Sequence, residues 1–295
     1  MKALVIAEHA DAAAALAAGA RDLADEVVVA IVGTEEVSAN IADAAYRVTI
    51  PADAVADDAD ATLAALLDGV DLVIVEPTRH MKSVAGKLAA FKGASVITDA
   101  MSLENGETSQ MYFGGVGIIE RKATTPITFV TVRPSIFADM QASGSNGTAE
   151  ELDWVAPVAG VKLVSSDPIE KTGVDLTKSE VVVAAGRGFA EEDDLELARQ
   201  LCDKIGAGLG CTRPLAEANG WMPSDTYIGV SGLSLSPKAY IAAGISGQMQ
   251  HMVGANHSGT IFAINKDESA PIFKQCDYGL VGDLKTILPA LVEAL

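Results

Sequence analysis

Short runs of aliphatic residues alternate with longer amphipathic stretches through the first hundred residues of the chain. Strands that are apolar on both faces and are separated by helix-length segments are typical of a parallel sheet covered on both sides. This pattern predicts a doubly wound α/β domain. The expected strands are residues 4–7, 27–32, 48–50, 72–75 and 94–97, and the expected helices are residues 11–24, 35–45, 58–67 and 79–91.

The pattern changes after Asp99, where two short runs flank Asn105-Gly106. Asn-Gly favours the positive φ angles of a type I′ turn, so residues 101–104 and 108–113 are expected to form a hairpin. The glycines at 114, 115 and 117 lack the spacing of a phosphate-binding loop or a dinucleotide fingerprint, and we expect them to bend the backbone. Further strands are expected at residues 118–121 and 127–132.

A polar segment rich in Gly, Ser and Asn, residues 138–150, is typical of a surface linker. Residues 152–175 contain no clear helical pattern, and the domain boundary is expected near residues 172–178. The sequence therefore predicts an N-terminal domain over residues 1–175 and a second domain over residues 176–295.

Strands and helices alternate again in the second domain. An apolar run at residues 180–185 leads through Gly186-Arg187-Gly188 into an amphipathic helix that begins with acidic residues. Further on, residues 240–243 form an expected strand, 244–247 a tight turn, 248–254 the start of a helix, 260–264 a strand and 284–295 the last helix. This order predicts a second doubly wound parallel sheet. Ligands of such sheets bind at the carboxyl ends of the strands, and a glycine turn before a helix leaves N–H groups that suit phosphate.

Composition and charge narrow the function classes. The formal charge of −19 argues against a nucleic-acid binder, which needs clustered Lys and Arg. Three dispersed cysteines fit neither a disulfide framework nor a zinc or iron–sulfur site. The alanine-rich N-terminus is interrupted by charge too early for a signal peptide, and no run of about 20 apolar residues suggests membrane insertion. A cytoplasmic protein is expected.

The sequence contains no candidate residues for hydrolytic or metal-dependent chemistry. The chain has no GxSxG, no HExxH and no Cys-His pair at a recognisable spacing. Glu191 to Asp194 are most simply acidic residues that complement the dipole at the start of a helix. No catalytic residue and no metal site are therefore expected.

Arg187 is a candidate ligand-binding residue because it follows a strand directly. A guanidinium at such a loop suits the paired oxygens of a phosphate or pyrophosphate. Pairing with Glu191 or Asp193 on the surface is the alternative, and the residues alone do not decide between the two.

The segment GISGQMQHMVGANHSGTIFAINKD, followed by APIFKQCDYGLVGDL, closely resembles the FAD-binding segment of the electron transfer flavoprotein alpha subunit, in the bacterial branch associated with nitrogen fixation and carnitine metabolism. The resemblance implies FAD bound by residues from about 181 onward. It also implies a heterodimer in which the first domain packs on a beta subunit. The expected activity is electron relay from a flavin dehydrogenase, such as an acyl-CoA type, to a downstream acceptor.

The resemblance further implies roles for individual residues. Arg213, after the hydroxyl of Thr212, is expected beside the flavin ring, where a cation raises the potential. Ser231 would offer a hydroxyl to the ring, whereas Val230 departs from the glutamine of many relatives and would contact FAD, with Ile228 and Gly229, only through the backbone. An ordinary turn with Ser231 as its cap stays open. His251 is expected near flavin O2.

The resemblance also implies which residues bind the pyrophosphate, the ribityl chain and the adenosine end of FAD. Ser246, Gly247, Gln248, Met249 and Gln250 are expected to offer N–H groups to the pyrophosphate and side chains to the ribityl chain, although Met249 could belong to the core. Asn265 and Asp283 correspond to positions at the adenosine end of FAD. A turn-forming Asn265 and a helix-capping Asp283 remain alternatives.

Two other functions stay open. Some relatives carry a second FAD, bound mainly by the beta subunit, and bifurcate electrons from NADH. A doubly wound domain could also hold a nucleotide without redox chemistry.

Overall fold

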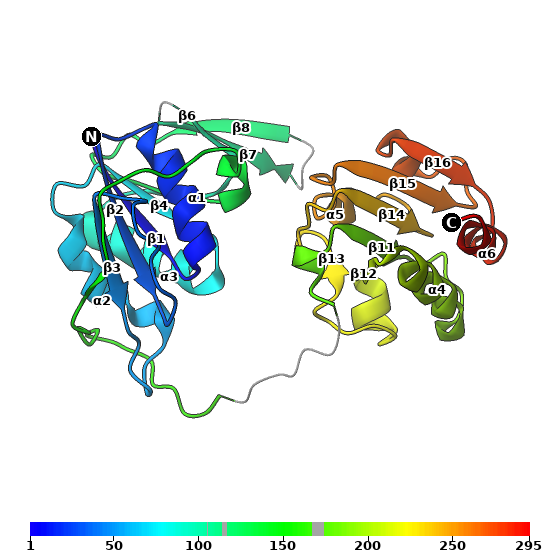
Figure 1. The fold of residues 1–295 in the computed structure, drawn as a ribbon, viewed down its shortest axis with the longest axis horizontal. Coiled ribbons are helices and arrows are strands. Elements are labelled where there is room, and N and C mark those ends of the chain that lie inside the picture. The colour runs from blue at the N-terminus through cyan, green and yellow to red at the C-terminus, as the bar shows by residue number, and fades with distance from the viewer. Residues whose placement is uncertain (105, 114–116, 167–173) are drawn as a thin grey trace. The chain divides into compact units, whose positions relative to one another are not determined.

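A computed structural model describes residues 1–104, 106–113, 117–166 and 174–295 of the chain, drawn in Figure 1. Within them the chain forms two compact units, one over residues 1–112 and 117–166 and one that includes residues 174–295. The predicted boundary at residues 172–178 falls partly outside the described residues. Each unit is built on its own parallel sheet, which confirms the predicted α/β class with two doubly wound domains.

The first unit contains a seven-stranded sheet in which every paired strand is parallel to its neighbour. After Lys2, its central strand β1 consists of small and branched apolar residues that are buried on both faces, as a covered parallel strand requires. Across the sheet the strands are β10 (Glu150–Glu151), β3 (Ala44–Val48), β2 (Glu26–Val32), β1 (Lys2–Ala7), β4 (Leu72–Val75), β9 (Thr128–Val132) and β5 (Val96–Ala100).

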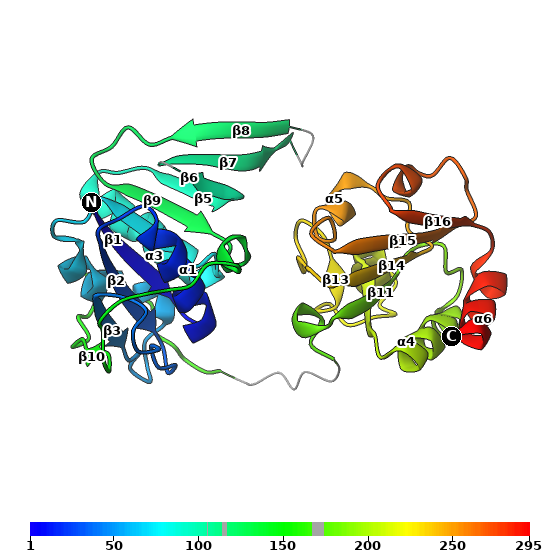
Figure 2. The ribbon, with the colours of Figure 1, turned by 45° about the horizontal axis from the view of Figure 1, so that its top comes forward.

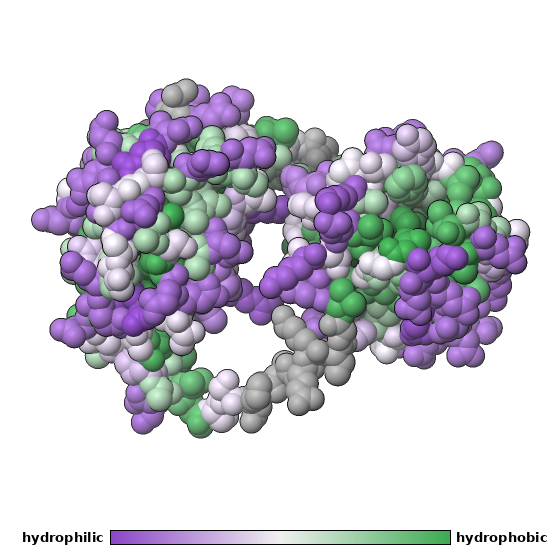
Figure 3. All heavy atoms as spheres, in the orientation of Figure 1, coloured by the Kyte–Doolittle hydropathy of each residue, from purple (hydrophilic) through white to green (hydrophobic). Residues whose placement is uncertain are grey.

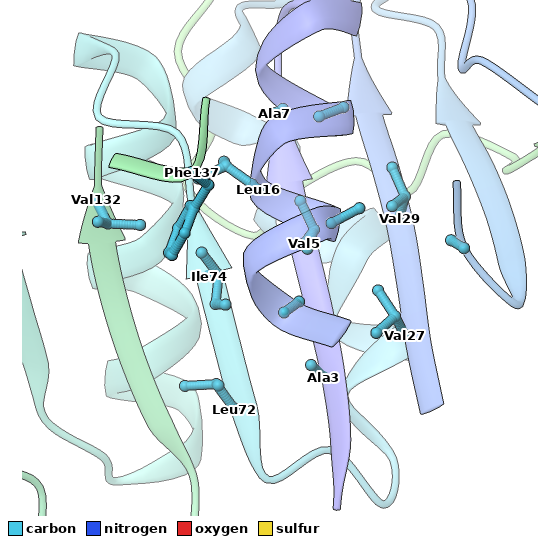
Figure 4. Packing of buried hydrophobic residues seen from close by; sticks show 14 of the residues in the cluster. Ala3, Val5, Ala7, Leu16, Val27, Val29, Leu72, Ile74, Val132 and Phe137 are labelled. Atoms are coloured by element: carbon cyan, nitrogen blue, oxygen red, sulfur yellow. The ribbon is translucent and has the colours of Figure 1, made fainter. Parts of the chain in front are cut away.

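Helices cover both faces of this sheet. On one face, Leu16 of α1 (Ala10–Arg21) and Phe137 of the 3-10 turn η4 (Pro134–Phe137) pack on Val5 and Ile74, as Figure 4 shows. On the other face lie α3 (Arg79–Lys92) and the short elements η1 (Ala56–Asp58), α2 (Asp60–Leu63) and η2 (Ala64–Leu67). The core therefore lies in two layers, one on each side of the strands.

Three antiparallel strands extend the first unit: β6 (Ser102–Glu104), β7 (Glu107–Tyr112) and β8 (Gly117–Lys122). The pairing of β6 with β7 confirms the predicted hairpin. The predicted turn residue Asn105 and the glycines at 114 and 115 lie outside the described residues.

Two predicted helices in the first unit are wrong. Residues 35–43 contain turns and bends, because Asn40 has a left-handed φ of 62° and the side chain of Asn146 accepts from the N–H groups of Ile41 and Ala42 at 2.8 Å. The following residues pair with β2 as β3, which also displaces the predicted strand at 48–50. The predicted helix at 58–67 is broken into α2 and its two flanking 3-10 turns.

The second unit contains a six-stranded parallel sheet, seen in Figure 2. Helices α4 (Leu195–Ile205) and α6 (Leu284–Ala294) cover one face, and the one-turn helix α5 (Met249–Met252) with η5 (Leu176–Lys178) and η8 (Pro271–Lys274) covers the other. In sheet order the strands are β13 (Tyr227–Ile228), β12 (Gly208–Thr212), β11 (Val181–Ala185), β14 (Ala239–Ala243), β15 (Thr260–Asn265) and β16 (Tyr278–Val281).

Hydrophilic residues dominate much of the visible surface of each unit in Figure 3. The longest helix among the described residues, α3, has 14 residues. No described helix is both long and apolar enough to span a bilayer.

Candidate functional site

The second sheet reverses its strand order between β11 and β14. The chain continues from β11 to β12 and β13 on one side, and from β14 to β15 and β16 on the other. The loops that leave β11 and β14 therefore diverge, which opens a crevice at the carboxyl ends of the strands. A cavity of about 1040 Å³ lies there. This volume lies just above the usual range for small-molecule and cofactor pockets, roughly 300–1,000 Å³.

Most of the predicted site residues line this cavity. They come from four loops that are far apart in the sequence and that follow β11, β12, β13 and β14, together with the end of β15. The predicted residues in the lining are Arg187, Thr212, Arg213, Ile228, Gly229, Val230, Ser231, Ser246, Gln248, Gln250, His251 and Asn265.

Three predicted residues are not part of the cavity lining. The backbone of Gly247 is pressed against η8, since a Cβ there would lie 2.4 Å from the Ile272 nitrogen. Met249 is half-buried. Asp283 lines a neighbouring cavity of about 130 Å³ together with Asn265, and its carboxylate caps α6 by accepting from the Lys285 N–H at 2.8 Å.

Glycines form the rim where the loops after β11 and β14 meet. A Cβ on Gly188 would lie 2.5 Å from the Gly244 Cα, and Gly244 has a left-handed φ of 66°. The two backbones can therefore approach only without side chains. Gly229, with φ 143°, is under a similar constraint, because a Cβ there would lie 2.5 Å from the Gln250 carbonyl oxygen.

Backbone N–H groups are available beside this rim. Among the described residues, none accepts a hydrogen bond from the N–H groups of Gly247, Gln248, Met249 or Gln250. The helix that follows is shorter than expected, because α5 is one turn and its dipole is correspondingly small. Four consecutive N–H groups, rather than a long helix, are the feature that suits an anion here.

Two arginines and one aspartate are the charged residues in the lining. Arg187 is exposed and makes no ion pair with any described residue, so the alternative pairing with Glu191 or Asp193 is not observed. Arg213 pairs with Glu217 at 2.5 Å, and this contact raises the pKa of its guanidinium. The third charge is that of Asp267. The cavity thus carries a local excess of cations in a chain with a formal charge of −19.

A buried hydroxyl faces the same region. The Thr212 Oγ1 is shielded from solvent and has no hydrogen-bond partner among the described residues. A buried hydroxyl without a partner is costly, and a ligand in the cavity would relieve that cost. In the adjacent loop the Val230 side chain is 60% exposed, whereas its N–H donates to the Gln250 carbonyl at 2.8 Å and the Gly229 N–H donates to the Leu233 carbonyl at 3.0 Å. These two N–H groups are already used within the protein.

His251 is held between two strands. Its Nδ1 lies 3.0 Å from the Ile228 carbonyl oxygen and its Nε2 lies 2.7 Å from the Tyr240 hydroxyl. The residue is 8% exposed, and burial lowers its pKa to about 4. The imidazole is therefore neutral at pH 7, with both nitrogens engaged by protein groups.

Asn265 makes turn-forming contacts, the role that was considered as an alternative to binding the adenosine end of FAD. Its Nδ2 donates to the Ile245 carbonyl at 2.9 Å, and its Oδ1 accepts from the Asp267 N–H at 3.0 Å. It lines both cavities while it holds the two loops together.

Several lining residues were not predicted. Gly188 and Gly244 belong to the glycine loops, and Ala270-Pro271 opens the APIF motif, so the sequence carried a signal for these four. Asp267 ends the quoted segment that resembles the FAD-binding segment, whereas Tyr227 lies outside the quoted segments and becomes visible only through the fold. The other unpredicted lining residues are Pro214 and Ile245.

Comparison with known proteins adds family information to this geometry. The family model described as the electron transfer flavoprotein domain matches residues 3–157, and the model described as the electron transfer flavoprotein FAD-binding domain matches residues 175–256. Protein FixB of Escherichia coli O17:K52:H18 (strain UMN026 / ExPEC) is 44% identical over 229 residues, which cover 76% of this chain and 73% of the relative. Protein FixB of Escherichia coli O7:K1 (strain IAI39 / ExPEC) matches to the same extent.

Solved structures give a weaker likeness. A putative thiamin diphosphate-dependent enzyme isolated from Mycobacterium smegmatis aligns with 99% of this chain and 60% of its own, at 10% identity and a TM-score of 0.26. A score this low carries no argument about fold or function.

Proposed function

Because this chain belongs to the electron transfer flavoprotein family, as an FAD-binding alpha subunit of the FixB branch, we propose that the cavity at the carboxyl ends of the second sheet holds its FAD. Membership of the family implies a beta-subunit partner and, in general, a relay between a dehydrogenase and an acceptor. We further propose an acyl-CoA type dehydrogenase as the donor.

The observation that carries the placement is the run of four N–H groups at residues 247–250 that have no acceptor among the described residues. Gln248 and Gln250 of this run line the cavity with the glycine rim and two arginines. This set suits a pyrophosphate, which needs N–H donors, cations and close backbone approach. The Thr212 hydroxyl, which has no partner in the described part of the chain, and the cavity volume of about 1040 Å³ fit a large polar cofactor. The residues present therefore fit FAD.

When bound, FAD supplies the ability to accept and release electrons. The chain contributes binding and electrostatics. Arg213 places a positive charge in the cavity, tempered by its partner Glu217. Arg187, which has no carboxylate partner among the described residues, is available to a phosphate oxygen. Thr212 and Ser231 offer hydroxyls, and the glycine rim lets the backbone approach the ligand.

We place the subunit interface on the N-terminal domain, residues 1–175, and FAD binding on residues 176–295. Exposed apolar side chains support an interface in the first unit, among them Ile118, Val158 and Val164, which are 69%, 108% and 95% exposed. Apolar side chains left in water are typical of surfaces that a partner covers. The free thiols of Cys202, Cys211 and Cys276 suit the reducing cytoplasm, which we propose as the location.

An absorbance spectrum of this chain co-expressed with its beta subunit tests the proposal. Two flavin bands that bleach on dithionite titration are expected, with one FAD released per heterodimer on denaturation. Two FAD per heterodimer would support the bifurcating alternative. A colourless complex would sink the proposal.

Variants of two arginines locate the site. Arg187→Gln is expected to weaken FAD retention roughly three- to tenfold, the effect of about 1 kcal/mol of lost charge–phosphate interaction. Arg199→Gln is the matched control, because Arg199 lies on α4, outside the cavity lining, and pairs with Glu196 at 3.6 Å. Equal FAD retention in both variants would remove Arg187 from the site.

A further inference from the structure

A buried hydrogen-bonded pair lies directly behind the cavity. Tyr240, the second residue of β14, is fully buried and does not line the cavity, whereas His251 does. The Tyr240 hydroxyl lies 2.7 Å from the His251 Nε2, and the His251 Nδ1 lies 3.0 Å from the Ile228 carbonyl oxygen. The imidazole thus connects β14 with the end of β13.

The chemistry of the partners decides where the hydrogens are. A carbonyl oxygen only accepts, so Nδ1 carries a hydrogen and donates it to Ile228. In the neutral ring Nε2 is then an acceptor, and the Tyr240 hydroxyl donates to it. Burial raises the pKa of Tyr240 well above its ordinary value, so the hydroxyl keeps its hydrogen.

The same partners also suit a charged ring. A hydroxyl can accept as well as donate, so Tyr240 can receive a hydrogen bond from a protonated Nε2 after its own hydrogen turns away from the ring. Both N–H groups of the imidazolium would then have acceptors, Ile228 and Tyr240, without movement of any heavy atom. A phenylalanine at position 240 would leave Nε2–H without an acceptor.

Burial opposes protonation of His251 while the cavity carries no added negative charge. Arg187 and Arg213 line the cavity with His251, and Asp267 is the carboxylate there. Tyr227 lines it as well, and Cys211 lies close enough to Tyr240 to influence it. Desolvation therefore favours the neutral ring until negative charge arrives, and the hydrogen bond to the Ile228 carbonyl offsets this only in part.

We infer that Tyr240 is a positioning residue that lets His251 take up one proton at Nε2 when the cofactor in the cavity is reduced. The inference rests on the proposed function, since it requires FAD in this cavity. Electrons from the dehydrogenase add negative charge to the cavity, and one proton from solvent forms the Nε2–H bond. On reoxidation the electrons leave, the Nε2–H bond breaks, and the proton returns to solvent.

Nitrogen-15 NMR of histidine rings tests this directly. The complex with the beta subunit is prepared with labelled histidine, and His251 is assigned by the loss of its signals in His251→Gln. In the oxidised protein at pH 7 the expected state of His251 is one protonated nitrogen, Nδ1. In the dithionite-reduced protein both nitrogens are expected to be protonated. A ring that stays singly protonated after reduction would overturn the inference.

The variant Tyr240→Phe isolates the hydroxyl, and Tyr278→Phe is the matched control because Tyr278 is exposed on β16. Tyr240→Phe is expected to leave His251 singly protonated in the reduced protein, whereas Tyr278→Phe behaves like the wild type. Proton uptake that persists in Tyr240→Phe would contradict the role of the hydroxyl.

The wild-type measurement decides the matter even where Tyr240→Phe fails to fold. Absence of flavin from the wild-type complex would overturn the proposed function and this inference together. A flavin-loaded complex whose His251 stays neutral on reduction would overturn only this inference.

Discussion

The two parallel sheets differ in the loops at the carboxyl ends of their strands, although both reverse their strand order beside a central strand. At the carboxyl end of β1, the Glu76 carboxylate accepts from the N–H groups of Glu8 at 2.7 Å and His9 at 3.2 Å, and it contacts the His9 Nδ1 at 2.7 Å. The next N–H, of Ala10, donates to Glu35 at 2.6 Å. Side chains of the first unit therefore occupy the N–H groups that an anion would use.

In the second unit, the loop after β14 lies at the same edge of the sheet, and there the N–H groups of residues 247–250 have no described partner and a large cavity lies beside them. The two units thus share a fold class but differ in the loops. A doubly wound sheet therefore only offers the position for a ligand, and the side chains of its loops decide whether the N–H groups there are free to bind one.

A bulky side chain at the carboxyl end of the second sheet should have the largest effect on stability and FAD retention. Gly229→Val forces a left-handed residue with a Cβ 2.5 Å from the Gln250 carbonyl oxygen. Strain and overpacking should destabilise the second unit by about 2–4 kcal/mol and abolish FAD retention. Denaturant unfolding and the flavin spectrum measure both. Gly86→Val is the control, since nothing lies within 4 Å of a Cβ at Gly86 in the first unit. Normal flavin content in Gly229→Val would contradict the site.

The stabilities of the two units should respond differently to acid, and the second unit should lose stability. The pKa of His251 is lowered by burial to about 4, so the unfolded chain binds a proton that the folded chain does not between pH 6.5 and 4. Stability contributed by the neutral ring is present above pH 6.5 and is lost as the pH falls, by about 3 kcal/mol at pH 4.

The first unit should respond in the opposite direction. The hydrogen bond that the His9 ring donates to Glu76 raises the pKa of His9, so its contribution is present below pH 6.5 and is lost as the pH rises through the raised value. Hydrogen exchange at pH 7 and pH 4.5 measures the two units separately. Equal acid sensitivity of both units, or unchanged sensitivity in His251→Gln, would count against this comparison.

Removing the charge of Glu76, whose carboxylate occupies the N–H groups after β1, should have a moderate effect on the stability of the first unit. Glu76 is 7% exposed, and Glu76→Gln weakens its charge-assisted hydrogen bonds, which should cost the first unit about 2 kcal/mol. Glu35→Gln, at an exposed carboxylate, should cost less. Thermal unfolding measures the difference. FAD retention should be normal in both variants, and loss of flavin in Glu76→Gln would show that the units are not independent in this respect.

The smallest effects are expected for the ion pair between Arg213, which lines the cavity, and Glu217. Arg213→Ala removes a cation and should lower the flavin potential, while Glu217→Gln frees that cation and should raise it. A unit charge within several ångströms of the ring interacts by about 1–2 kcal/mol in a wet site, or roughly 30–100 mV. Redox titration of both variants gives the two signs, and shifts of the same sign would remove the pair from the electrostatics of the site.

Much of the fold could be predicted because parallel strands that are apolar on both faces are distinctive. Residues 27–32 and 72–75 were predicted within a residue of β2 and β4. The failure at residues 35–45 has a long-range cause, since Asn146 fixes the backbone of Ile41 and Ala42 from more than a hundred residues away. Periodicity within the segment could not reveal that contact.

The site was predictable where motifs mark it and hidden where the fold creates it. The glycine loops and Arg213 stand in recognisable segments, and the structure brings them to one cavity. Tyr240 was assigned only to a buried strand, because the contact between its hydroxyl and His251 depends on how β14 and α5 pack. Likewise, nothing in the sequence states that Glu76 closes the first sheet.

Hydrogen exchange of the complex with the beta subunit, with and without FAD, tests the central claim that the second sheet is open to the cofactor and the first is closed. FAD is expected to slow exchange at residues 229–231 and 247–250 and to leave residues 8–10 unchanged. Slower exchange at residues 8–10, or unchanged exchange at residues 247–250, would contradict this assignment of the cofactor site.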